Sequence, residues 1–156
     1  MSLHASAILL NLKKSLDSHL ASALSGSGVA IDWEGIVQDM SQSAEVVQPR
    51  GRLKRQKIMG NSPNGRGVGL EFLLSMNIFV RTSENAGRLA EIRDILAEAF
   101  PPGGRVPFYD YAPTSPELVD QITILDLVTD GEVAAKSGYL QHNLTVGCHL
   151  VQQWPS

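Results

Sequence analysis

Residues 70–81 read LEFLLSMNIFVR, and this stretch determines the class of fold. Apolar side chains occupy every even position from Leu70 to Val80, whereas Glu71, Ser75 and Asn77 occupy odd positions. An alternation of two residues is typical of a β-strand that buries one of its faces. We therefore predict a long strand whose even-numbered side chains line the core.

Two other segments have the apolar spacing of amphipathic helices. The first covers residues 3–24 and ends at the Ser-Gly-Ser-Gly sequence 25–28, because glycine tolerates the left-handed conformation at a helix C-terminus. The second follows Thr82-Ser83-Glu84, which suits a helix N-terminus, and ends at Pro101. The apolar positions recur at intervals of three or four: Leu9, Leu12, Leu16 and Leu20, then Leu89, Ile92 and Leu96.

Further strands are predicted before and after the second helix. Their ranges are 29–33, 45–59 with an interruption near Pro49-Arg50-Gly51, 106–109, 118–128 and 139–151. Because strands follow one another instead of alternating with helices, the sequence predicts an α+β fold. We expect one domain over residues 1–156, a mainly antiparallel sheet, and both helices packed on one face of it.

The strand predicted over 118–128 has apolar residues on both faces. Such a strand needs burial on two sides, and a neighbouring subunit could cover the side that the helices leave open. We place Ile122, Ile124 and Val128 on one face and Val119, Leu125 and Leu127 on the other.

Positive charge is concentrated in residues 50–66, which we call the basic arm. No Asp or Glu occurs between Val46 and Leu70, and polar side chains on both faces of 52–57 prevent that strand from lying flat in a core. The Asn64-Gly65 pair predicts a chain reversal, so we expect a projecting hairpin. Six of the thirteen basic residues lie in the arm: Arg50, Arg52, Lys54, Arg55, Lys57 and Arg66.

Three interpretations of the basic arm stay open at this stage. It could be a solvated edge whose charges oppose aggregation, a contact for an acidic partner surface, or a contact for nucleic-acid backbone. The net charge of −3 and the pI near 5.8 argue against a dedicated nucleic-acid-binding protein. Aromatic residues are absent from 50–66, which argues against base stacking.

The remaining composition favours a folded cytoplasmic protein. The apolar runs fall short of the ~20 residues that a membrane-spanning helix requires, and no secretion signal is recognisable at the N-terminus. The single cysteine, Cys148, cannot form an intrachain disulfide, and its place on an apolar strand face predicts burial.

We expect no catalytic, metal or cofactor site. His142 and His149 are seven residues apart in one predicted strand, so they should point to opposite faces. The glycines at 65, 67 and 69 precede a strand, whereas a phosphate-binding loop precedes a helix. A small enzyme with a site around His142 and Asp110 is kept as an alternative.

The order of these elements resembles the tail terminator proteins of long-tailed bacteriophages, and is similar to the minor tail protein U of lambda-like phages. The resemblance lies in the helix 5–24, the strand 29–33, the hairpin 51–69, the strand 70–81, the Ala86-Gly87-Arg88-Leu89 helix opening and the closing strands.

This resemblance implies a non-catalytic virion tail protein, assembled in the bacterial cytoplasm from a phage or prophage genome. It implies a hexameric ring that ends growth of the tail tube and forms the joint to the head connector, with tube and connector proteins as partners. The arm would lie over an adjacent subunit or face the channel through which DNA passes. Another neck or tail-completion protein, or a small immunity- or antitoxin-like binding module, remains an alternative.

Overall fold

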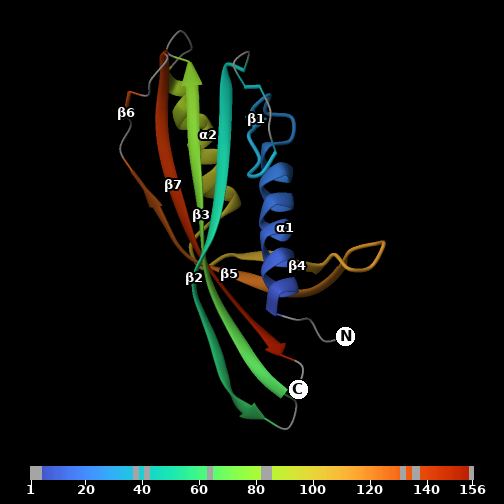
Figure 1. Cartoon of the computed structure of the whole chain (residues 1–156). Coiled ribbons are helices and arrows are strands. Elements are labelled where there is room, and N and C mark those ends of the chain that lie inside the picture. Colours follow the sequence, from blue (N-terminus) through green and yellow to red (C-terminus); the bar gives the residue numbers. More distant parts are fainter. Residues whose placement is uncertain are drawn as a thin grey trace.

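The computed structural model describes residues 5–36, 39–40, 43–62, 65–81, 86–130, 133–134 and 138–154. The described part contains two helices and a seven-stranded sheet (Figure 1). The elements are α1 (Ala5–Leu24), β1 (Ala30–Ile31), β2 (Glu45–Ser62), β3 (Gly65–Arg81), α2 (Ala86–Ala99), β4 (Arg105–Asp110), β5 (Glu117–Thr129), β6 (Val133–Ala134) and β7 (Tyr139–Trp154). The predicted α+β class is confirmed.

The sheet is built around the long β3–β7 pair. Its strand order is β1-β2-β3-β7-β5-β4, with β6 also paired to β7. β3 and β7 are antiparallel over their whole length, from Arg66 opposite Trp154 to Arg81 opposite Tyr139. Every described pairing is antiparallel except the short parallel contact between β1 and β2.

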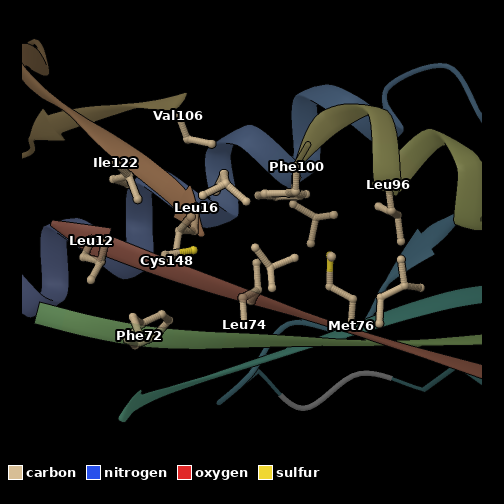
Figure 2. Close-up of a cluster of buried hydrophobic side chains, with 14 of the residues drawn as sticks. Leu12, Leu16, Phe72, Leu74, Met76, Leu96, Phe100, Val106, Ile122 and Cys148 are labelled. Carbon is tan, nitrogen blue, oxygen red and sulfur yellow. The ribbon is translucent and has the colours of Figure 1, made fainter. Parts of the chain in front are cut away.

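The core lies between one face of this sheet and both helices. Every even-numbered residue of β3 from Val68 to Val80 is buried, which confirms the predicted strand and its orientation. Figure 2 shows Phe72, Leu74 and Met76 facing helix side chains. Those side chains come from both helices and include Leu12, Leu16, Leu96 and Phe100.

Polar contacts fix the two helices relative to each other and to the sheet. The His19 ring nitrogen Nε2 lies 2.6 Å from the Ala99 carbonyl oxygen, and the His19 ring meets Phe100 edge-on at 5.0 Å. Arg88 of α2 pairs with Glu45 at 2.7 Å and donates to the Ser27 carbonyl oxygen at 2.6 Å. These contacts join both helices to the start of β2.

α1 is also held to β4 by buried polar groups. Asn11 and Ser15 are almost fully buried on α1 and accept hydrogen bonds from the backbone amides of Tyr111 and Tyr109. The Asn11 amide donates to Asp110, whose carboxylate also accepts from the Ala112 amide. Asp110 therefore has a structural role, and its described contacts do not include His142.

Two predicted strand ranges differ from the structure at the edge of the sheet. The strand expected over 29–33 is only two residues long, because β1 pairs with β2 only at Val46 and Val47. The interruption expected near Pro49 is wrong, since β2 continues through it with Pro49 opposite Met76. Proline is tolerated there because its nitrogen faces outward, as does the Gly51 amide that donates to Glu34.

The predicted faces of the strand 118–128 are also partly wrong. A register shift between Ile124 and Asp126 makes Leu125 an extra residue, and this β-bulge reverses the alternation that follows it. As a result Leu127 packs against the core while Val128 is 53% exposed. Ile122 and Ile124, which precede the bulge, are buried as predicted.

Candidate functional site

The basic arm is a projecting part of the sheet. β2 and β3 remain paired up to Ser62 opposite Gly65, and the reversal between them, residues 63–64, lies outside the described residues. Figure 1 shows β2, β3 and β7 continuing past both helices. The predicted hairpin is therefore confirmed, and β7 adds a third strand that the sequence did not predict at this position.

Arg50 is part of the folded body. Its guanidinium pairs with Asp32 at 3.3 Å and donates to the backbone oxygens of Asp32 and Pro49, both at 2.7 Å. Asp32 also accepts a hydrogen bond from Gln48. Arg50 therefore anchors the segment that follows β1 to the outer edge of β2, which is a structural role.

Arg55 and Arg66 occupy different positions in the arm. Arg55 forms an exposed ion pair with Glu71 across the β2–β3 ladder at 2.9 Å. Arg66 belongs to the β3 backbone opposite Asn61 and Trp154, and its side chain lies outside the described part. The gap in acidic residues along the sequence is therefore not a gap in space, because β3 contributes Glu71.

Among the arm side chains that the structure describes, Arg52, Lys54 and Lys57 are the other exposed cations. Among the described residues, no carboxylate lies within ion-pair distance of these three side chains. Leu53 and Ile58 lie beside them in the chain and are 36% and 53% exposed. We call residues 52–58 the arm surface; it combines exposed positive charge with exposed apolar side chains.

A second feature, which we call the Trp33 pocket, lies between α1 and the segment after β1. It has a volume of about 300 Å³ and is lined by Asp17, Ser18, Ala21, Trp33, Glu34 and Ile36. A neighbouring cavity of about 30 Å³, the size of a single water site, shares Asp17 and Glu34 and reaches Lys13 and Gly51. Gly35, with φ of 80°, allows the turn that follows Glu34.

The Trp33 pocket disfavours the charged form of the Asp17 carboxyl group. Burial and, to a lesser extent, the nearby Glu34 carboxylate raise the pKa of Asp17 to about 6, against the opposing effect of Lys13. This proximity could not be predicted from the sequence, because Asp17 and Glu34 belong to separate segments with no shared periodicity. Asp32 and Glu34 have different partners, since Asp32 binds Arg50 and Glu34 borders the pocket.

The other candidate chemistry is not assembled into a site. Cys148 is buried as predicted, and burial together with Asp126 raises the pKa of its thiol to about 12, which disfavours a thiolate nucleophile. His142 is buried while His149 is half-buried on the opposite face, as predicted. Within the described ranges, no three His, Cys, Asp or Glu side chains are grouped to hold a metal ion. Neither described helix is long and apolar enough to cross a bilayer.

Comparison with known proteins shows the fold only. No protein family and no curated protein matches the sequence. One solved chain that carries no descriptive name aligns with a TM-score of 0.67 at 8% identity, over 94% of this chain and 96% of that chain. A chain described as "Virion of native gene transfer agent (GTA) particle" aligns over 94% and 93% at 13% identity, with a TM-score of 0.44 that is too low to carry an argument. The first likeness shows that the architecture recurs elsewhere over nearly its full length.

Proposed function

We propose that this protein is a non-catalytic structural component of a tailed phage particle that closes the end of the tail tube as an oligomeric ring. In this role it would stop tube growth and form the joint to the head connector. The resemblance in element order to tail terminator proteins motivates the proposal, and the projecting three-stranded arm is the observation that carries it. A small domain that extends three strands beyond its helices has surface suited to binding other subunits.

Exposed apolar side chains support an assembled state. Leu118, Val119, Leu125 and Val128 of β5 are between 46% and 57% exposed. The bulge at Leu125 exposes Leu125 and Val128, and a second register shift, in the β4–β5 ladder, falls at Val119. An assembly would remove these apolar side chains from water, which favours association.

The arm is better suited to protein contact than to sequence-independent DNA binding. Two of its six basic side chains, Arg50 and Arg55, already pair with carboxylates, and the whole chain is net negative. Contact with DNA passing through the ring would then depend on the other four, Arg52, Lys54, Lys57 and Arg66. The arm surface also carries apolar residues, which favour a folded protein partner.

Electron microscopy of the purified protein with tail tubes tests the proposal. The tubes are polymerised from the tail tube protein encoded in the same genome. We expect rings at the tube ends and tubes that cease to lengthen when the protein is added during polymerisation. Tubes of unchanged length with bare ends would overturn the proposal, and binding to the connector alone would point to a different neck protein.

A further inference from the structure

We propose that the Trp33 pocket of one copy of this chain receives a lysine of the arm surface, Lys54 or Lys57, from a second copy. This contact would join copies head to tail. It specifies the subunit contact of the ring proposed above and rests on that function for its biological purpose. The contact itself needs neither a tail tube nor a connector, so it can be tested separately.

The pocket has the chemistry of a site for a cationic side chain. Asp17 and Glu34 place two carboxylates against one hollow, and Lys13 is the described cation that acts on Asp17. Trp33 adds an aromatic ring, which attracts an ammonium group over its face. Ile36 is 53% exposed at the same hollow and offers apolar contact to the methylene stem of a lysine.

The arm surface offers the complementary groups. Lys54 and Lys57 are exposed, and no described carboxylate pairs with either of them. Leu53 and Ile58 are exposed next to them and would meet the apolar wall of the pocket. Each surface therefore supplies the charge that the other lacks and adds apolar area at the contact.

Lys57 of a chain cannot reach that chain's own pocket through a straight strand. Gly51 borders the small cavity beside the pocket, and β2 leads away from it toward the arm. At about 3.4 Å per residue, Lys54 lies roughly 10 Å and Lys57 roughly 20 Å along the strand from Gly51. A second molecule must therefore provide Lys57, and the mixture of variants described below separates contact between copies from any contact of Lys54 within one chain.

Head-to-tail contact has a consequence for assembly. Each copy carries one arm surface and one Trp33 pocket on different parts of its surface, so a row of joined copies still has one free arm surface at one end and one free pocket at the other. Such a heterologous contact produces a closed ring when the rotation between neighbouring copies adds up to a full turn, and a filament when it does not. The contact is compatible with the ring of the proposed function.

Neutral variants of the two surfaces give the sharpest test, with sedimentation velocity of the full chain as the readout. The pocket variant is D17N/E34Q and the arm variant is K54Q/K57Q. We expect the wild type to self-associate, and each variant alone to need at least about tenfold higher concentration. An equimolar mixture of the two variants should stop at a one-to-one dimer, because only one intact arm and one intact pocket can meet.

Two further chains control this experiment. The variants E98Q on α2 and R105Q on β4 change exposed charges away from both surfaces and should associate as the wild type does. The chain that combines E34K with K54E and K57E reverses both partners and should recover association. Circular dichroism confirms that each variant is folded before it is compared.

Several results would overturn the inference. These are a wild type that stays monomeric at about 1 mM, neutral variants that associate like the controls, or a mixture that forms no dimer. If both neutral variants fail to self-associate yet the wild type ignores tail tubes, the proposed function fails and the inference stands. If both neutral variants still form rings on tubes, the inference fails and the proposed function stands.

Discussion

The two halves of β2 are continuous in the chain and pair with the same strand, yet only the first half belongs to the core. In the first half, Val46, Val47 and Pro49 are buried. In the second half, every residue from Arg52 to Ile58 is exposed. The first half has an unbroken ladder to β3, and the second half stays paired with it apart from register shifts between Leu53 and Arg55 and between Met59 and Asn61, so strand pairing alone does not determine burial.

The contacts outside the β2–β3 ladder make the difference. Beside the first half lie β1 and the segment after it, which contribute Asp32 to Arg50 and Glu34 to the Gly51 amide. The second half has no described strand on its outer edge. Figure 1 shows that it also extends beyond the helices. A strand edge without a neighbouring strand commonly carries lysine and arginine, which oppose pairing with strands of other chains.

The largest difference between the halves should appear on truncating apolar side chains. Phe72 is 1% exposed and lies opposite Leu53, where the two halves meet, whereas Ile58 is 53% exposed on the arm. We expect Phe72→Ala to lower the free energy of unfolding by about 3–5 kcal/mol, because it removes transfer energy and leaves a cavity. Ile58→Ala should change it by less than about 0.5 kcal/mol. Urea titration measures both, and equal losses would show that the arm is part of the core.

A smaller difference is expected from adding one methyl group to each half. A Cβ atom at Gly51 would lie 2.5 Å from the tip of the Phe72 ring, whereas a Cβ atom at Gly60 would have no heavy atom within 4 Å. We expect Gly51→Ala to destabilise the fold by about 1–3 kcal/mol through overpacking. Gly60→Ala should be neutral or slightly stabilising, because alanine restricts the unfolded chain. Thermal unfolding of the two variants side by side compares them, and a tolerated Gly51→Ala would show that Phe72 can move.

Local alternation explains which parts of the fold could be predicted. β3 and both helices carry their periodicity in their own residues, and all three were predicted close to their observed ranges. The length of β1, the continuity of β2 at Pro49 and the bulge at Leu125 depend on which neighbour lies on the strand edge. These three features are decided by how the strands pair, so they cannot be predicted from the residues of one strand alone.

For the candidate site too, some features could be predicted from one segment and others depend on packing between segments. Clustered cations in one segment predicted the arm, but the partners of Arg50 and Arg55 lie at Asp32 and Glu71, outside the segment. The Trp33 pocket could not be predicted, because Asp17 and Glu34 meet only when the chain after β1 packs beside α1. Charge along the sequence thus located a surface without revealing how much of it is neutralised.

Asp17, which lines both the Trp33 pocket and the small cavity beside the first half of β2, should make stability depend on pH. The pKa of Asp17 is about 6 in the fold against an ordinary 3.8, so the folded protein holds the proton more tightly than the unfolded chain. The contribution of Asp17 to stability is therefore present below about pH 4 and is lost as the pH rises through 6. We expect D17N to be more stable than the wild type at pH 7.5 by on the order of 1 kcal/mol, allowing for solvent screening.

Urea titrations at pH 5 and pH 7.5 check this expectation. The advantage of D17N should shrink at the lower pH, where the wild-type carboxyl is largely protonated. The matched control is D94N on the exposed face of α2, which should show no such trend. An advantage of D17N that is the same at both pH values would show that its cause is not the ionisation of Asp17.

The smallest effect on the fold, and the largest on assembly, is expected from reversing the charges of the second half of β2. We expect the variant with Arg52, Lys54, Arg55 and Lys57 all changed to glutamate to fold normally. Its unfolding free energy should fall by no more than about 1 kcal/mol, since only Arg55 has a described ion pair, and exposed pairs contribute little. The same variant should fail to cap tail tubes, because four positive groups of the arm become negative. Thermal unfolding and electron microscopy with tubes measure the two effects on one sample.

If the variant unfolds instead, the second half of β2 is held by these side chains, and the two halves differ only in how strongly they are held. If it folds and still caps tubes, the charge of the arm serves only to keep a free strand edge from pairing with other chains.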